Sequence, residues 1–125
     1  MGVQKKILLI DDDTECLEYI GGILEDEGFD VVTATDGNKG CEKAVAEKPD
    51  MIFLDVMMPE QDGWDTCDEL RSIIATEKIP IVYLTCVNPP ESLYESHVAF
   101  ATDWDEYLNK PLRKKELLAT VRKFI

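Results

Sequence analysis

The sequence has few basic residues for its number of acidic ones. Lys and Arg together number 13, against 26 Asp and Glu, which gives a formal net charge of −13. Such a chain lacks the general basic surface with which proteins bind DNA, RNA or anionic membranes. We therefore expect no direct nucleic-acid binding by this chain alone.

Long apolar runs are missing as well. The first apolar run covers residues 7–10, and three acidic residues follow it at once. A signal peptide needs a longer apolar stretch with a small-residue cleavage site, and a transmembrane helix needs about 20 apolar residues. We therefore expect no membrane insertion and a cytoplasmic location.

Cysteine pairs and histidine clusters are also missing. The chain has one histidine, His97, which is not close to any of its four cysteines, Cys16, Cys41, Cys67 and Cys86. No two of these cysteines form a Cys-x-x-Cys pair, so the spacing excludes zinc-finger and thioredoxin-type sites. We expect free and mostly buried thiols in a reducing compartment.

What remains is a chain of one-domain size with enough apolar residues for a core. It has 125 residues, and 45% of them are hydrophobic. Single domains most often run to about 100–150 residues. We expect one globular domain over residues 1–125, with no room for a second module such as a DNA-binding domain.

Short apolar runs alternate along the chain with segments of helical periodicity. The runs predict strands at residues 7–10, 31–33, 51–54, 81–84 and 106–108. The first is apolar throughout, as expected of a strand buried on both faces. Strands that alternate with helices indicate an α/β protein with a parallel sheet, and right-handed crossovers place helices on both of its faces.

The helices are predicted from apolar residues at helical spacing. One extends from Thr14 to about Glu27, with Asp13 or Thr14 as N-cap and with Gly21-Gly22 weakening it. A second has Cys41, Ala44 and Val45 along one side and ends before Pro49. Three more are marked by Leu70, Ile73 and Ile74, by a start near Pro89-Pro90, and by Leu117, Leu118, Val121 and Ile125.

Chemically capable side chains follow several of these strands directly. In open parallel sheets the functional site lies beyond the carboxyl ends of the strands. There the sequence places carboxylates, a hydroxyl and an ammonium group: Asp11-Asp12-Asp13, Asp55, Thr85 and Lys110. Each alone has an ordinary structural explanation, such as a helix cap for Asp13. Their joint placement at four strand ends favours a shared site.

Crowded carboxylates repel each other unless a cation lies among them, and Mg²⁺ is bound by one or two carboxylates with water and phosphate oxygens. Lys110 can neutralise a phosphoryl group, and Thr85 can donate a hydrogen bond to it. An aspartate can itself be the nucleophile and form an aspartyl phosphate. The set suits phosphoryl transfer to a carboxylate.

Three stretches of the sequence resemble the receiver domain of two-component response regulators. They are residues 7–13, with the acidic run after the first strand; residues 107–111, Tyr-Leu-Asn-Lys-Pro; and residues 55–63, with the pattern D-x-x-M-P-x-x-D-G. The resemblance implies a flavodoxin-like (βα)₅ three-layer sandwich, whose parallel five-stranded sheet has the order 2-1-3-4-5.

The resemblance also implies a role for each site residue. Asp55 would accept a phosphoryl group from a histidine kinase or a histidine phosphotransfer protein. Mg²⁺ would be held by Asp12, by Asp11 partly through water, by Asp55 and by the backbone carbonyl of Met57. Lys110 and Thr85 would contact the phosphoryl group, and Tyr107 would turn inward as a switch, although Tyr107 could also be ordinary core. Such a protein is not an enzyme beyond its own phosphorylation and dephosphorylation, and it acts on an output partner as a monomer or a phosphorylation-dependent dimer.

Other interpretations stay open at this point. A haloacid-dehalogenase-type phosphatase would use the D-x-D spacing of Asp11 and Asp13, but the chain has no room for the cap and extra strands that such enzymes carry. A receiver-like interaction module that signals without phosphorylation is a second alternative, and a flavodoxin is disfavoured by the acidic first loop. Trp104 is either a contact residue or buried, and the basic residues after residue 112 are either a solvated face or a docking stripe.

Overall fold

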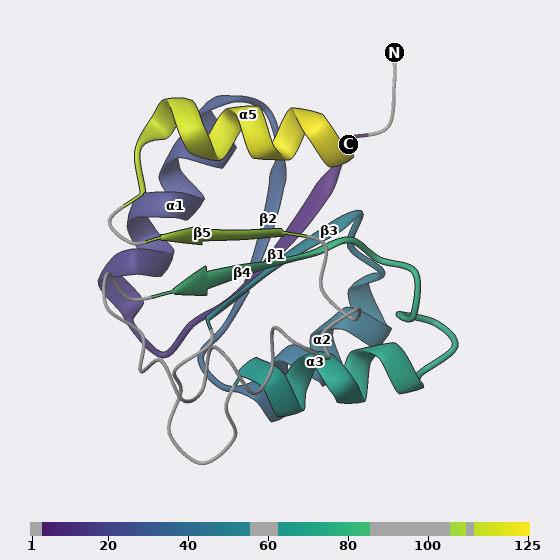
Figure 1. The fold of residues 1–125 in the computed structure, drawn as a ribbon. Coiled ribbons are helices and arrows are strands. Elements are labelled where there is room, and N and C mark those ends of the chain that lie inside the picture. Colours follow the sequence, from purple (N-terminus) through teal and green to yellow (C-terminus); the bar gives the residue numbers. More distant parts are fainter. Residues whose placement is uncertain (1–3, 56–62, 86–105, 110–111) are drawn as a thin grey trace.

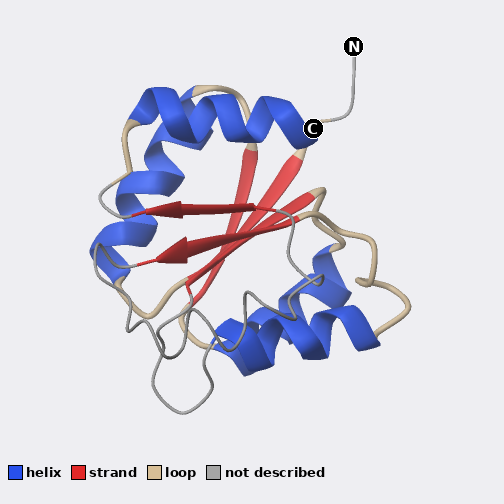
Figure 2. Ribbon diagram, viewed as in Figure 1, coloured by secondary structure: helices blue, strands red, loops and turns tan. Residues whose placement is uncertain are grey.

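The computed structural model describes residues 4–55, 63–85, 106–109 and 112–125 of the chain. Figure 1 shows a central sheet with helices on both faces, and Figure 2 separates the strands from the helical layers. The strands are β1 (Lys6–Ile10), β2 (Asp30–Ala34), β3 (Met51–Asp55), β4 (Ile81–Thr85) and β5 (Glu106–Asn109). The helices are α1 (Thr14–Asp26), α2 (Gly37–Glu47), α3 (Gly63–Ser72) and α5 (Lys114–Phe124).

All neighbouring strands are parallel, and their order is β2-β1-β3-β4-β5. The predicted flavodoxin-like α/β fold and its strand order are therefore confirmed. The order reverses direction between β1 and β3, so this is the switch point beyond which ligands bind in open α/β sheets. The helix predicted near Pro89-Pro90 lies outside the described residues.

Two apolar layers hold the helices against the sheet. On one face, α1 and α5 pack on the sheet through a cluster that includes Leu9, Phe53 and Leu117. On the other face, α2 and α3 pack on a cluster that includes Ile10, Leu54 and Leu70. Strands β1 and β3 contribute side chains to both faces of the sheet. This is why the sequences of these two strands are apolar without alternation.

Side chains and turns fix the ends of the helices. The Asp13 carboxylate accepts hydrogen bonds from the backbone N–H groups of Glu15 and Cys16, at 3.0 and 3.3 Å, so Asp13 is the N-cap of α1 as predicted. Lys48 follows α2 with φ 48° and ψ 61°, a left-handed conformation that ends the helix before Pro49.

A side chain of α2 also contacts the edge of the sheet. The Lys43 ammonium donates to the backbone carbonyl of Thr33 on the edge strand β2.

Two predictions about helices α2 and α3 are wrong in detail. Val45 does not share the buried side of α2 with Cys41 and Ala44, because it is 41% exposed. Helix α3 ends at Ser72, so Ile74 lies beyond it and is 87% exposed. Helix α3 ends at this point because the hydroxyl of the buried Thr76 donates to the carbonyl of Leu70 at 2.6 Å and closes the last turn of the helix.

Replacing Gly22 by Ala should stabilise the fold. Gly22 lies inside α1, and a Cβ atom built on it meets nothing within 4 Å. A glycine within a helix costs about 0.5–1 kcal/mol relative to alanine, so we expect the free energy of unfolding to rise by about that amount. Urea denaturation with an unchanged m-value would measure it. Gly28→Ala is the control and should destabilise, because Gly28 has φ +94°.

The thiol of Cys41 is buried between α2 and the rest of the core and is close to Glu69 of α3. Burial raises the pKa of this thiol to about 12, and the Glu69 carboxylate, which accepts its hydrogen bond, acts in the same direction. We therefore expect Cys41 to react with iodoacetamide far more slowly than the partly exposed Cys16 in the native protein. Peptide mapping of the alkylated chain would show the order, and equal labelling of both thiols would contradict it.

The same thiol should make stability depend on pH in the alkaline range. The folded protein holds the Cys41 proton to a higher pH than the unfolded chain does, since the ordinary thiol pKa is 9.0. Its contribution is therefore fully present below about pH 9 and is lost as the pH rises toward 12. Urea denaturation of the wild type and of Cys41→Ala across this range should show the steeper loss in the wild type.

Candidate functional site

The first part of the site is the turn between β1 and α1. Asp11 follows the last residue of β1 and is fully buried, with its backbone N–H donating to the carbonyl of Ala34 at 3.1 Å. Its carboxylate accepts a hydrogen bond from the backbone N–H of Asp13 at 3.0 Å, the geometry of an Asx turn. Asp12 lies between them and is exposed. The turn therefore fixes one acidic side chain inward and leaves its neighbour facing solvent.

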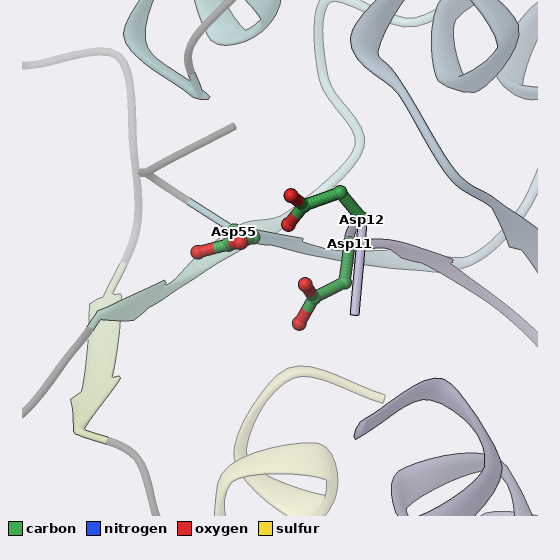
Figure 3. A group of neighbouring side chains, drawn as sticks. All are labelled: Asp11, Asp12 and Asp55. Carbon is green, nitrogen blue, oxygen red and sulfur yellow. The ribbon is translucent and has the colours of Figure 1, made fainter. Parts of the chain in front are cut away.

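The second part is the end of β3. The register of β1 and β3 pairs Ile10 with Leu54, so Asp11 and Asp55 come next on adjacent strands. Asp55 is 3% exposed. Figure 3 shows Asp11, Asp12 and Asp55 with their carboxylates gathered at the strand ends, and one oxygen of each lies within 4.8 Å of one oxygen of the other two. The sequence prediction that these acids meet is confirmed.

This cluster brings three carboxylates together, and two of them, Asp11 and Asp55, are buried. Two unit charges about 4 Å apart repel by roughly 1 kcal/mol in water and by about 4 kcal/mol near a protein surface. A divalent cation among the three carboxylates would remove that repulsion. All three donors are oxygen atoms, and the exposed Asp12 leaves one side open to solvent, which suits Mg²⁺ because it retains water and takes only a few protein ligands.

The other predicted site residues lie at neighbouring positions of the sheet or outside the described residues. Asp55 pairs with Leu84, so Thr85 ends β4 one position further along. Tyr107 lies in β5 opposite Tyr83. Met57 and Lys110 lie outside the described residues, as do Cys86 and Trp104. The backbone positions of Thr85 and Tyr107 thus agree with the predicted site, and their roles stay predictions.

One contact near this end of the molecule is not predicted by the sequence. The hydroxyl of Tyr19 on α1 donates to the backbone carbonyl of Leu112 at 3.0 Å, and the two residues are 93 positions apart. Leu112 follows Lys110-Pro111 directly. No periodicity or spacing pairs these positions, because the contact depends on how α1 and α5 pack against the same face.

A family model for the response regulator receiver domain matches residues 7–122. The chain belongs to this family. Receiver domains are signalling modules of two-component systems rather than classical enzymes, and they typically hold Mg²⁺ in an acidic pocket. This receiver domain has a cluster of three acids, Asp11, Asp12 and Asp55, at the carboxyl ends of its strands.

Two curated relatives are transcriptional regulators. The receiver domain is 39% identical over 117 residues to the DNA-binding dual master transcriptional regulator RpaA of Synechocystis, which covers 94% of this chain and 47% of that protein. It is 36% identical over 122 residues to the alkaline phosphatase synthesis transcriptional regulatory protein PhoP of Bacillus subtilis, covering 96% and 48%. The chain therefore spans about half the length of these relatives.

Among solved structures, the receiver domain is similar to the chemotaxis protein CheY4 of Vibrio cholerae. The two share 30% sequence identity with a TM-score of 0.84, and the match covers 98% of this chain and 100% of that one.

In the part of the receiver domain that the structure describes, every helix falls short of the length and apolar character needed to cross a membrane.

Proposed function

We propose that this receiver domain, over residues 1–125, accepts a phosphoryl group on Asp55 and uses it to control a partner protein. The observation that carries the proposal is the meeting of Asp55 with Asp11 and Asp12, within 4.8 Å, at the switch point of the sheet. Asp55 is held at the end of a strand by β1 and β4 on its two sides. Its carboxylate is thus positioned by rigid elements, as in-line attack requires.

In the proposed reaction, a carboxylate oxygen of Asp55 attacks the phosphorus atom of a phosphohistidine on a histidine kinase or phosphotransfer protein. The new O–P bond forms as the P–N bond breaks, and the electron pair of that bond leaves with the imidazole nitrogen. Mg²⁺, when bound, would neutralise charge on the phosphoryl oxygens. Asp11, Asp12, Asp55 and the carbonyl of Met57 are the ligands that we propose for it.

The remaining predicted residues would respond to the new phosphoryl group. Lys110 would pair with it, Thr85 would donate a hydrogen bond to it, and Tyr107 would turn inward, so that a local charge biases a two-state surface. The output partner would read that surface in the cytoplasm. Phosphorylation would leave the protein monomeric or bring two copies together.

One observation weighs against the phosphatase alternative. That alternative needs both acids of the Asp11-x-Asp13 pair for chemistry, but the Asp13 carboxylate caps α1 by accepting two backbone hydrogen bonds. The alternative of an interaction module that signals without phosphorylation gives no reason for two carboxylates, those of Asp11 and Asp55, to be buried close together.

Incubation with Mg²⁺ and a small acyl phosphate, followed by intact mass measurement, tests the proposal. We expect one phosphoryl adduct per chain, which hydroxylamine removes because it cleaves acyl phosphates. An adduct that resists hydroxylamine, or no adduct with any donor, would leave the interaction module as the better explanation. Steady release of phosphate from a small phosphate ester would favour the phosphatase.

A further inference from the structure

Asp13 is the third acid of the run that follows β1, and its side chain is directed to helix α1. Its carboxylate accepts hydrogen bonds from the backbone N–H groups of Glu15 and Cys16, at 3.0 and 3.3 Å. Its backbone carbonyl accepts a further hydrogen bond, from the N–H of Leu17 at 3.1 Å. Asp13 is therefore held to the first turn of α1 through both its side chain and its backbone.

Helix α1 is itself fixed against the sheet. Leu17, Ile20 and Leu24 are buried along one side of the helix and pack in the same apolar layer as Leu9 of β1. Side chains in a close-packed layer lose contacts when they shift, so the first turn of α1 has a defined place relative to the end of β1. A residue that is held to this turn shares that defined place.

The backbone of Asp13 also holds the side chain of Asp11. The N–H of Asp13 donates to Oδ1 of the Asp11 carboxylate at 3.0 Å. The backbone of Asp11 is fixed separately, because its own N–H donates to the carbonyl of Ala34 at 3.1 Å. The fully buried Asp11 carboxylate therefore has a set orientation within the acidic cluster (Figure 3).

We propose that Asp13 is a positioning residue of the metal site that acts through Asp11. This inference rests on the proposed function, in which Asp11 is one of the Mg²⁺ ligands. Mg²⁺ requires nearly ideal octahedral geometry, so a ligand whose direction is set in advance binds it better than one that has to be ordered. By capping α1, the Asp13 side chain keeps the N–H of its own residue directed at Asp11.

Asp13→Ala and Asp13→Asn together test the proposal. Both remove the same negative charge, but alanine removes the cap, whereas asparagine caps a helix about as well as aspartate. A hydrogen-bonding partner of a metal ligand typically contributes about 10- to 100-fold to affinity, and here the N–H itself remains. In Asp13→Ala the Mg²⁺ dissociation constant, measured from the dependence of the melting temperature on Mg²⁺ concentration, should therefore rise about three- to tenfold. In Asp13→Asn it should stay close to the wild-type value.

Asp36→Ala is the matched control for the loss of a cap. Asp36 is the N-cap of α2, and its carboxylate accepts a hydrogen bond from the backbone N–H of Lys39 at 2.7 Å. Its replacement removes a cap and a negative charge, as Asp13→Ala does, but from a different helix. The Mg²⁺ dissociation constant should therefore stay at the wild-type value. A rise equal to that of Asp13→Ala would mean that general destabilisation weakens the metal site, and would overturn the inference.

Amide hydrogen exchange separates positioning from fraying of the helix. In Asp13→Ala the N–H groups of Glu15 and Cys16 lose their acceptor, so they should exchange faster whether or not Asp13 positions Asp11. The N–H of residue 13 should also lose protection if the cap directs it at Asp11, and Asp13→Asn should restore the protection of all three groups.

The outcomes for the inference and for the proposed function can be told apart. Full protection at residue 13 in Asp13→Ala, an unchanged Mg²⁺ dissociation constant in that variant, or an equal rise in Asp13→Asn overturns the inference while the proposed function stands. A wild-type chain that Mg²⁺ does not stabilise overturns the Mg²⁺ site of the proposed function, and this inference with it.

Discussion

Asp55→Asn is expected to reduce phosphoryl adduct formation on the order of 100-fold or more, to below detection by intact mass. The amide has nearly the shape of the carboxylate but is a very poor nucleophile toward phosphorus. Asp55 is 3% exposed and ends the central strand β3, so a replacement there has to fit the packed surroundings. Asparagine has nearly the same shape as aspartate, and the fold should therefore be kept. The measurement is the adduct fraction over time with Mg²⁺ and a small acyl phosphate.

Asp26→Asn is the matched control for that experiment. Asp26 ends α1 and is exposed, so its replacement removes the same charge without touching the acidic cluster. It should take up the phosphoryl group at the wild-type rate. If Asp55→Asn still formed the hydroxylamine-sensitive adduct, the acceptor would be another carboxylate, and peptide mapping would identify it.

Asp12→Asn is expected to remove about half or more of the stabilisation that Mg²⁺ gives the folded protein. A ligand present at 100 times its dissociation constant stabilises by about 2.7 kcal/mol, which would be several degrees in the melting temperature of a domain of this size. Loss of one of three carboxylate ligands should weaken Mg²⁺ affinity at least about tenfold. Thermal melts with and without Mg²⁺ would measure the difference.

In the absence of Mg²⁺, the same substitution should raise the melting temperature instead of lowering it. Asp12 lies within 4.8 Å of two other acids, and its replacement relieves repulsion of roughly 1 kcal/mol per pair. Without Mg²⁺ the variant should therefore melt higher than the wild type. Asp13→Asn is the control, because asparagine caps a helix about as well as aspartate, so it should keep the full Mg²⁺ response. An unchanged Mg²⁺ response in Asp12→Asn would exclude Asp12 as a ligand.

The parts of the fold that followed from sequence are those set by local pattern. Buried strands read as unbroken apolar runs, and the parallel arrangement places the residue after each strand at one edge of the sheet. This is why the positions of Asp11 and Asp55 after two apolar runs were enough to predict that they meet. The Asp13 cap was equally local, since an acid directly before a helix accepts that helix's first N–H groups.

Other features depended on contacts that no local pattern encodes. Helical spacing predicted that Val45 and Ala44 both lie on the buried side of α2. In the structure, the packing of α2 buries Ala44 and leaves Val45 exposed. The end of α3 is set by the hydroxyl of Thr76, which has to reach back to Leu70. The Tyr19 contact with Leu112 joins α1 to the segment just before α5, and these two parts of the chain are neighbours only in the folded molecule.

The hydrogen bond from Lys43 to Thr33 bears on how this protein avoids self-association. β2 is an edge strand, and because Ala34 bonds to the β1 side, the carbonyl of Thr33 lies on the outer side. An incoming strand from another molecule would need that carbonyl, and would first have to displace an ammonium group and bury or remove its charge. The lysine therefore hinders the addition of a strand from another molecule at the β2 edge of the sheet.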